Sequence, residues 1–116
     1  MRIMDETQIE TLINAVDTFG IDNQSDIAIE EMSELTKAII KHRRYHTDKT
    51  MANLMEEIAD VQIMIWQLIF AYGSVRDIIN SKIERLEKRI NESKNKQQST
   101  ERSTKISVKA RVRKRI

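Results

Sequence analysis

The sequence predicts an all-α protein, and three observations support this fold class. The 116 residues include two glycines and no proline, and only 4% are aromatic. Strands favour aromatic and β-branched residues separated by turn residues, whereas this composition suits helices joined by short turns. Apolar residues also recur at the three- and four-residue spacing of amphipathic helices. A chain of this length forms one small domain with a modest core, so self-association would help to stabilise it.

Two helices are predicted in the first part of the chain. The first covers about residues 5–18 and stops at Gly20. Its apolar residues at helical spacing are Ile9, Leu12, Ile13 and Val16. The second helix runs to Arg44. Polar residues that can cap its start are Asn23, Ser25 and Asp26.

Two more helices follow the polar segment HRRYHTDKT, residues 42–50, which we interpret as a connector. The third covers about residues 50–72 and ends at Gly73, a residue suited to the left-handed conformation after a helix. Ser74 and Asp77 resemble a capping box that starts a fourth helix, which reaches about Asn91. Four helices with short connections predict an antiparallel four-helix bundle. Because the third helix is apolar nearly all round, we expect the bundle to form a homodimer or a higher homo-oligomer.

Charge is distributed unevenly along the chain. The net charge is +2, but residues 94–116 contain nine basic residues and one acidic residue, so they carry about +8 and residues 1–93 about −6. Helical periodicity ends after Asn91, where the sequence SKNKQQSTERSTK is polar and of low complexity. We therefore expect a helical domain over residues 1–91 and a disordered basic tail over residues 92–116. Nucleic acid is a candidate partner of this tail.

The sequence predicts a cytoplasmic protein with no membrane partner. Its first residues, MRIMDETQIE, become acidic early and lack the apolar core of a signal peptide. The most apolar stretch, IADVQIMIWQLIFAYG, is too short to span a bilayer and contains Asp60, Gln62 and Gln67. The chain has no cysteine, which excludes disulfides and thiolate metal sites.

Two short acidic segments carry the candidate chemistry: EEMSE, residues 30–34, in the second helix and EEIAD, residues 56–60, in the third. On a helical wheel Glu31 lies within the apolar face of its helix, and Glu34 lies at the margin of that face. Glu57 lies within the apolar face of the third helix, with Asp60 about 60° away. Four carboxylates turned toward the bundle interior would repel one another. We therefore expect a hard cation between them, Mg²⁺ or in its place Mn²⁺.

Other interpretations of these carboxylates remain open. They could form salt bridges with Lys37, with Lys41 or with the fourth helix. A di-iron bundle would need a Glu-x-x-His motif on two helices, and the sequence contains none. His42 and His46 are one helical turn apart and could bind a metal, although they lie in or beside the basic connector.

The fourth helix carries a basic stripe at i, i+3 and i+7. Ordinary charge pairing on a helix surface would explain such a stripe. Beside a magnesium and carboxylate cluster it would instead bind the phosphates of a substrate, because charge develops on phosphoryl oxygens during their transfer. The candidate substrate-binding residues are Lys82, Arg85 and Arg89.

EEMSE followed by EEIAD, on successive helices with a basic connector between them, resembles the EExxE…ExxD signature of the MazG-like all-α nucleoside triphosphate pyrophosphohydrolases. The similarity covers about residues 19–90, including FGIDNQSDIAIEEMSEL and SKIERLEKRI. The resemblance implies a helical bundle that dimerises or assembles further, with bound Mg²⁺. It also implies hydrolysis of a (d)NTP to the monophosphate and pyrophosphate.

By position, the resemblance assigns roles to individual residues. The metal ligands it implies are Glu31, Glu34, Glu57 and Asp60. The leading glutamates Glu30 and Glu56 would act in catalysis, by supporting the metal ligands or by orienting the attacking water. Lys82 and Arg89 match basic positions of the family's last helix, whereas Leu86 stands where the family often has Asn.

These observations predict a Mg²⁺-dependent enzyme of nucleotide-pool control whose substrate is a (d)NTP. The alternative is a non-catalytic helical interaction module whose basic tail binds nucleic acid. The enzyme and the interaction module can be distinguished, because only the enzyme needs the carboxylates and a metal for its activity. Binding by the module would instead follow the tail and weaken as salt rises.

Overall fold

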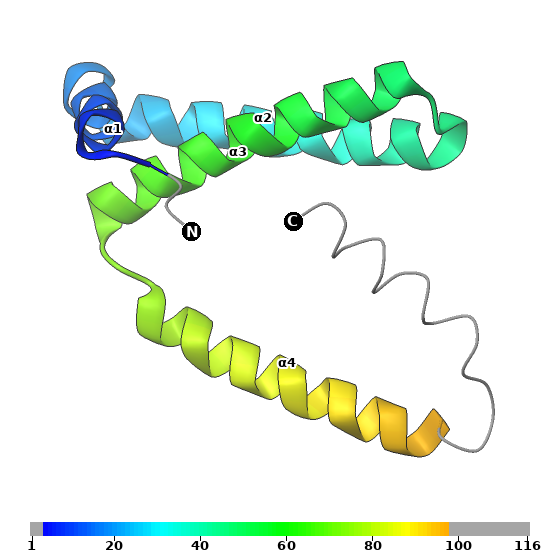
Figure 1. Cartoon of the computed structure of the whole chain (residues 1–116). Helices are drawn as coiled ribbons and strands as arrows, with labels where there is room; N and C mark the ends of the chain where they lie inside the picture. The colour runs from blue at the N-terminus through cyan, green and yellow to red at the C-terminus, as the bar shows by residue number, and fades with distance from the viewer. Residues whose placement is uncertain (1–3, 98–116) are drawn as a thin grey trace. The chain divides into compact units, whose positions relative to one another are not determined.

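The structure, a computed structural model, describes residues 4–97, and its regular elements are all helices (Figure 1). The helices are α1 (Glu6–Phe19), α2 (Ile21–Tyr45), α3 (Asp48–Tyr72) and α4 (Arg76–Gln97). The predicted all-α class is confirmed over this range, whereas the four-helix bundle and its oligomerisation stay predictions. The chain divides after Ser74 into two units, so α1, α2 and α3 belong to the first and α4 to the second. Residues 98–116, most of the predicted tail, lie outside the described residues.

Capping at both ends defines α1. Gln8 N–H donates to Asp5 Oδ1 over 2.8 Å, and Asp5 N–H donates to Gln8 Oε1 over 3.0 Å, which together form a capping box. At the other end Gly20 N–H donates to the Val16 carbonyl over 2.9 Å. Gly20 has a backbone φ of 87°, a value that residues with a Cβ rarely adopt, so glycine is the residue suited to this turn.

The start of α2 corrects a prediction. Gly20 ends α1 and also begins α2 at once, because its carbonyl accepts a hydrogen bond from Gln24 N–H over 3.0 Å. Asn23, one of the predicted caps, therefore lies inside the helix, where its Nδ2 donates to the Phe19 carbonyl over 3.0 Å. Ser25 and Asp26 are likewise helical, so the predicted caps are wrong.

The connector between α2 and α3 is also shorter than predicted. α2 continues to Tyr45, and His46 then adopts the left-handed conformation with φ 48°. Thr47 caps α3, since its Oγ1 accepts from Thr50 N–H over 3.1 Å while its own N–H donates to Thr50 Oγ1 over 3.0 Å. The polar residues 42–50 thus belong mostly to the two helices and leave a tight turn between them.

The end of α3 and both ends of α4 differ in detail from the predictions. Gly73 N–H donates to the Ile69 carbonyl over 2.8 Å, but its φ of 127° and ψ of 167° lie outside the left-handed helical region. α4 begins at Arg76 and continues to Gln97, beyond the predicted end at Asn91. Residues 92–97 contain no glycine or proline to stop the helix, so their polarity was a poor guide to its end.

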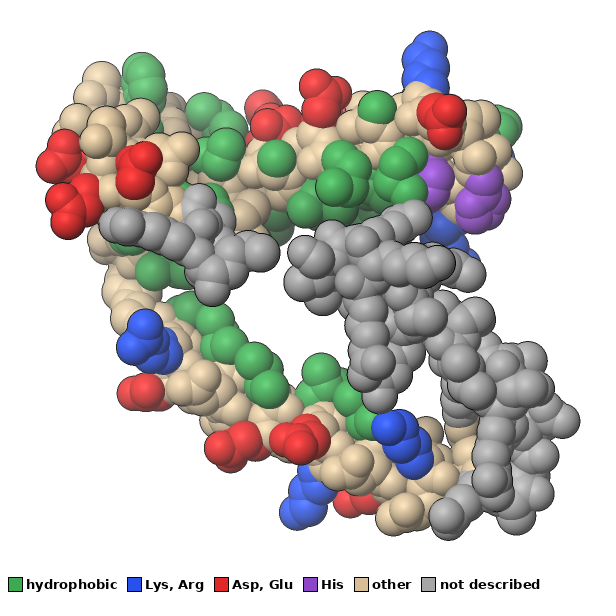
Figure 2. All heavy atoms as spheres, viewed as in Figure 1, with side chains coloured by type: hydrophobic (Ala, Val, Ile, Leu, Met, Phe, Trp, Pro, Cys, Tyr) green, Lys and Arg blue, Asp and Glu red, His purple; other side chains and the backbone are tan. Residues whose placement is uncertain are grey.

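The first unit is a helical hairpin crossed by a shorter helix. α2 and α3 lie side by side, and α1 contacts both (Figure 1). The buried apolar residues are Ala28, Ala38, Val61 and Met64. Large apolar side chains remain exposed on all three helices, and those of Phe19, Ile29 and Met55 are more than half exposed. Hydrophobic side chains are therefore prominent on the surface of the hairpin (Figure 2).

None of the helices within residues 4–97 combines the length and the apolar character that a membrane span requires.

Candidate metal centre

Two side-chain hydrogen bonds define how α2 lies on α3. Near the turn, His42 Nδ1 and Thr50 Oγ1 are 2.9 Å apart. At the open end of the hairpin, Gln24 Nε2 donates to Gln67 Oε1 over 2.7 Å. The helices are therefore antiparallel, and residues midway along α2 lie opposite residues midway along α3. EEMSE and EEIAD both occupy this middle part.

Three of the predicted metal ligands meet across the hairpin. Glu31 of α2 and Glu57 and Asp60 of α3 each offer one carboxylate oxygen, and these three oxygens all lie within 4.8 Å of one another. Glu31 and Glu57 are half-buried, and Asp60 is exposed. We call these residues the acidic triad. Among the described residues it is the one group of three or more acidic, histidine or cysteine side chains with the spacing of a metal site.

The electrostatics of the triad disfavour full ionisation. Burial raises the pKa of Glu31 above its ordinary value of 4.5, and the charges of Asp60 and Glu57 raise it further. A hydrogen bond shared with Asp60 and the charge of Glu34 act in the same direction. Within residues 4–74 no basic side chain forms an ion pair with the triad. The cluster thus gathers negative charge that its own unit leaves uncompensated.

The geometry and chemistry of the triad fit a small hard cation. Glu57 Oε2 is buried, and no hydrogen-bond donor within the described residues reaches it. A buried carboxylate oxygen without a partner is energetically costly, and a cation would satisfy it. Oxygens on opposite sides of an octahedral Mg²⁺ are about 4.2 Å apart. Three oxygens within 4.8 Å of one another can therefore reach one ion through small side-chain movements.

Glu34, the fourth predicted ligand, does not join the triad. It is exposed, and its Oε1 lies 3.5 Å from Lys37 Nζ. One of the alternatives that the sequence left open, a salt bridge to Lys37, therefore occurs at this residue. Exposed ion pairs contribute at most about 1 kcal/mol, so a cation could compete for Glu34.

The remaining acidic and histidine candidates lie beside the triad or apart from it. Glu30 and Glu56 are exposed and are the chain neighbours of Glu31 and Glu57. His42 and His46 lie at the turn, with their ring centroids 5.3 Å apart, and the histidines belong to no group with metal-site spacing within residues 4–97.

The predicted substrate-binding residues belong to the second unit. Lys82, Arg85 and Arg89 all lie on α4 and are exposed. Lys82 and Arg85 line a shallow hollow along this helix, together with Asp77, Ile78 and Ser81. Their spacing places the three cations along one side of α4, as predicted.

Sequence reasoning missed the contact between Gln24 and Gln67, the two buried polar residues of the described chain. Gln67 counted only as a polar interruption of an apolar stretch. One observation could have identified the pair, since Gln24 precedes Glu31 by two helical turns and Gln67 follows Asp60 by the same interval. Residues at this interval share a helix face with the carboxylates.

No protein-family model matches the chain, and neither curated proteins nor solved structures include a match to it.

Proposed function

We propose that the protein is a Mg²⁺-dependent nucleoside triphosphate pyrophosphohydrolase that converts a (d)NTP to the (d)NMP and pyrophosphate. One observation carries the proposal, namely the acidic triad with its buried, unpartnered Glu57 Oε2. A second consideration is the resemblance of EEMSE and EEIAD to the MazG-like signature, because the triad consists of residues from these two segments. We further propose that the chain is a cytoplasmic member of this family, acting in nucleotide-pool control.

Glu31, Glu57 and Asp60 would hold the cation, and Glu34 would complete the carboxylate set after leaving Lys37. When bound, Mg²⁺ supplies positive charge for the phosphate oxygens and fixes the position of the triphosphate. The raised pKa of Glu31 means that a proton competes with the cation for its carboxylate. Carboxylate ligands alone, without cysteine or histidine, favour Mg²⁺ or Mn²⁺ over zinc.

The reaction requires a water oxygen to form a bond with phosphorus while the anhydride bond that releases pyrophosphate breaks. Glu30 and Glu56 are candidates for orienting that water and accepting its proton, because each is exposed and adjoins a triad glutamate in the chain. Lys82, Arg85 and Arg89 would offset the negative charge of the phosphates. They would act as substrate-binding residues.

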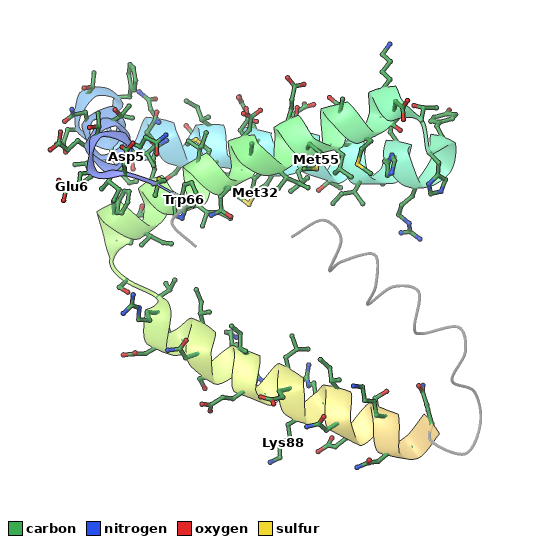
Figure 3. All side chains as sticks on the ribbon, in the orientation of Figure 1. Asp5, Glu6, Met32, Met55, Trp66 and Lys88 are labelled. Carbon is green, nitrogen blue, oxygen red and sulfur yellow. The ribbon has the colours of Figure 1, made fainter. Side chains whose placement is uncertain are left out.

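The surface of the first unit supports the proposal of a homo-oligomer. A hollow of about 580 Å³ lies between α1 and α3, on the side of α3 away from the triad. It is mostly apolar, and Leu12 and Ile58 contribute to its lining. Met55 and Trp66 of α3 line it too, and both are labelled in Figure 3. Exposed apolar surface of this kind often marks a protein interface. A second subunit would bury it.

A direct test measures pyrophosphate release from the eight common NTPs and dNTPs, with Mg²⁺ and with a chelator. We expect turnover of at least one nucleotide with metal and none without it. Glu57→Gln should abolish turnover, since it removes a charged oxygen ligand. The matched control is Glu10→Gln, the same exchange at an exposed position of α1, and it should keep the wild-type rate. Equal rates of pyrophosphate release in the two variants would show that Glu57 does not belong to the catalytic metal centre.

The exposed apolar surface also fits the alternative, a non-catalytic interaction module whose basic tail binds nucleic acid. This candidate would show no metal-dependent turnover of any nucleotide. Its binding to nucleic acid would weaken steeply with salt and would require residues 98–116.

A further inference from the structure

Gln24 and Gln67 form a buried polar contact between α2 and α3. Gln24 is 5% exposed and Gln67 is 3% exposed, and the other buried residues of the described chain are apolar. Their amides form a direct bond across the hairpin, from Gln24 Nε2 to Gln67 Oε1 over 2.7 Å. Gln67 Nε2 in turn lies 3.6 Å from Met64 Sδ. The pair thus ties α2 to α3 inside their interface.

Stability alone does not explain this pair. Gln24 Oε1 is buried and has no partner within the described residues. A typical hydrogen bond contributes about 1 kcal/mol to stability, whereas an unpaired buried acceptor costs about 1–3 kcal/mol. Two apolar side chains of similar shape would therefore stabilise the interface as well or better.

What the amide pair adds is a defined arrangement of the two helices. A hydrogen bond requires a particular distance and direction, whereas apolar side chains can pack in several ways with similar energy. The tight turn and the contact between His42 and Thr50 already hold the hairpin at one end. At its open end, the direct side-chain bond between α2 and α3 joins Gln24 to Gln67.

The triad lies between these two attachment points. Gln24 and Glu31 are two helical turns apart on one face of α2, and Asp60 and Gln67 are two turns apart on one face of α3. Each interval corresponds to about 10 Å along the helix. If the open end separated or rotated, Glu31 would move relative to Glu57 and Asp60.

We propose that Gln24 and Gln67 are positioning residues, whose mutual hydrogen bond fixes α2 on α3 and thereby sets the spacing of Glu31, Glu57 and Asp60. Their effect on metal binding rests on the proposed function, whereas their effect on helix placement does not. Neither residue needs to touch the metal or the substrate.

The test uses the full chain with Gln24→Met and Gln67→Met together, which removes both amides and nearly keeps their shape. The control is Asn14→Met, which also replaces an amide by Met, at an exposed position of α1 outside the apolar hollow. The chain has no cysteine, so Thr36→Cys on α2 and Asn53→Cys on α3, both exposed, allow attachment of two spin labels. Pulsed electron resonance, with unlabelled protein in excess, then measures the distance between the helices within one chain.

We expect the double variant to keep the melting temperature of the wild type or exceed it, while its label distance shifts or its distribution broadens. Its affinity for Mn²⁺, measured by calorimetry, should fall by roughly tenfold, the usual scale for losing a group that orients metal ligands. The Asn14→Met control should change neither the label distance nor the Mn²⁺ affinity. A purely structural role would lower stability without this selective loss. If the double variant fails to fold, Gln24→Met alone is judged by the same criteria.

An unchanged distance distribution in the variant would overturn the proposal, whatever the metal affinity. A changed distribution with wild-type Mn²⁺ affinity would also overturn it, because the spacing of the carboxylates would then not depend on the pair. If the wild type itself bound no Mn²⁺, the proposed function would fail. The label distances would still decide whether the glutamine pair positions the helices.

Discussion

Replacing Glu57 by glutamine should affect the protein in opposite directions with and without metal. In the metal-free protein Glu57 lies among like charges, since one oxygen of each triad carboxylate is within 4.8 Å of the others. Two unit charges at this distance repel by about 3 kcal/mol at an effective dielectric constant of 20 and by about 1 kcal/mol at that of water. Because Glu31 and Glu57 are half-buried and Asp60 is exposed, the lower value is the better guide.

Glu57→Gln should therefore stabilise the metal-free protein by about 1 kcal/mol, which raises the melting temperature of a small domain by about 4–8 °C. With Mg²⁺ at a hundred times its dissociation constant, the wild type should gain about 2.7 kcal/mol. The variant, which lacks a charged ligand, should gain little. Without metal the variant should melt above the wild type, and with metal below it.

Thermal melts of both proteins over a Mg²⁺ series measure this reversal, and Glu10→Gln is the control for loss of a distant negative charge. A Glu57→Gln protein that melted below the wild type without metal would show that the triad charges do not repel as the geometry requires. A variant that kept the full metal-dependent increase would show that Glu57 is not a ligand.

Four further predictions follow from the same features. Burial and neighbouring carboxylates raise the pKa of Glu31, so ionising this residue opposes folding. The metal-free wild type should therefore lose stability relative to Glu31→Gln as pH rises from about 4.5 through the raised pKa. Urea unfolding over a pH series measures this, and a stability difference between the two proteins that stayed constant with pH would contradict it. Glu34→Gln should abolish pyrophosphate release, whereas Lys37→Met should preserve it. Equal turnover in both variants would show that Glu34 pairs with Lys37 at the surface and is not a metal ligand. Light scattering at micromolar concentration should give an oligomeric mass that Trp66→Lys reduces, and a monomeric wild type would refute the role of the apolar hollow. Because α4 reaches Gln97, deletion of residues 98–116 should preserve the melting temperature and turnover but remove any affinity for nucleic acid. Aggregation or lost turnover would show that these residues are needed for the folded protein.

The sequence alone was sufficient to predict an all-α protein and to identify acidic residues as candidate metal ligands. Helical periodicity is a local property, so it places Glu31 and Glu57 on the apolar faces of their own helices without knowledge of any neighbour. Gly20 was likewise predictable as the end of the first helix, because a turn with positive φ suits a residue without a Cβ.

Local patterns were less informative about helix ends. Several polar residues near position 23 could each have capped α2, and the deciding factor was that the Gly20 carbonyl accepts the bond from Gln24 N–H. Polarity after Asn91 predicted disorder, yet polar residues without glycine or proline continue α4 to Gln97.

Only the tertiary structure decided which side chains meet across the hairpin. Glu34 and Asp60 both lie toward the edge of a helix face, but the placement of α2 on α3 brings Asp60 to Glu31 and leaves Glu34 with Lys37. The same placement joins Gln24 to Gln67, 43 positions apart in the chain. Periodicity specifies the direction of a side chain around its own helix axis, whereas a contact between helices also depends on their relative shift and rotation. Those two quantities depend on the tight turn, on packing along the interface and on contacts between distant residues such as Gln24 and Gln67, which no single segment of sequence contains.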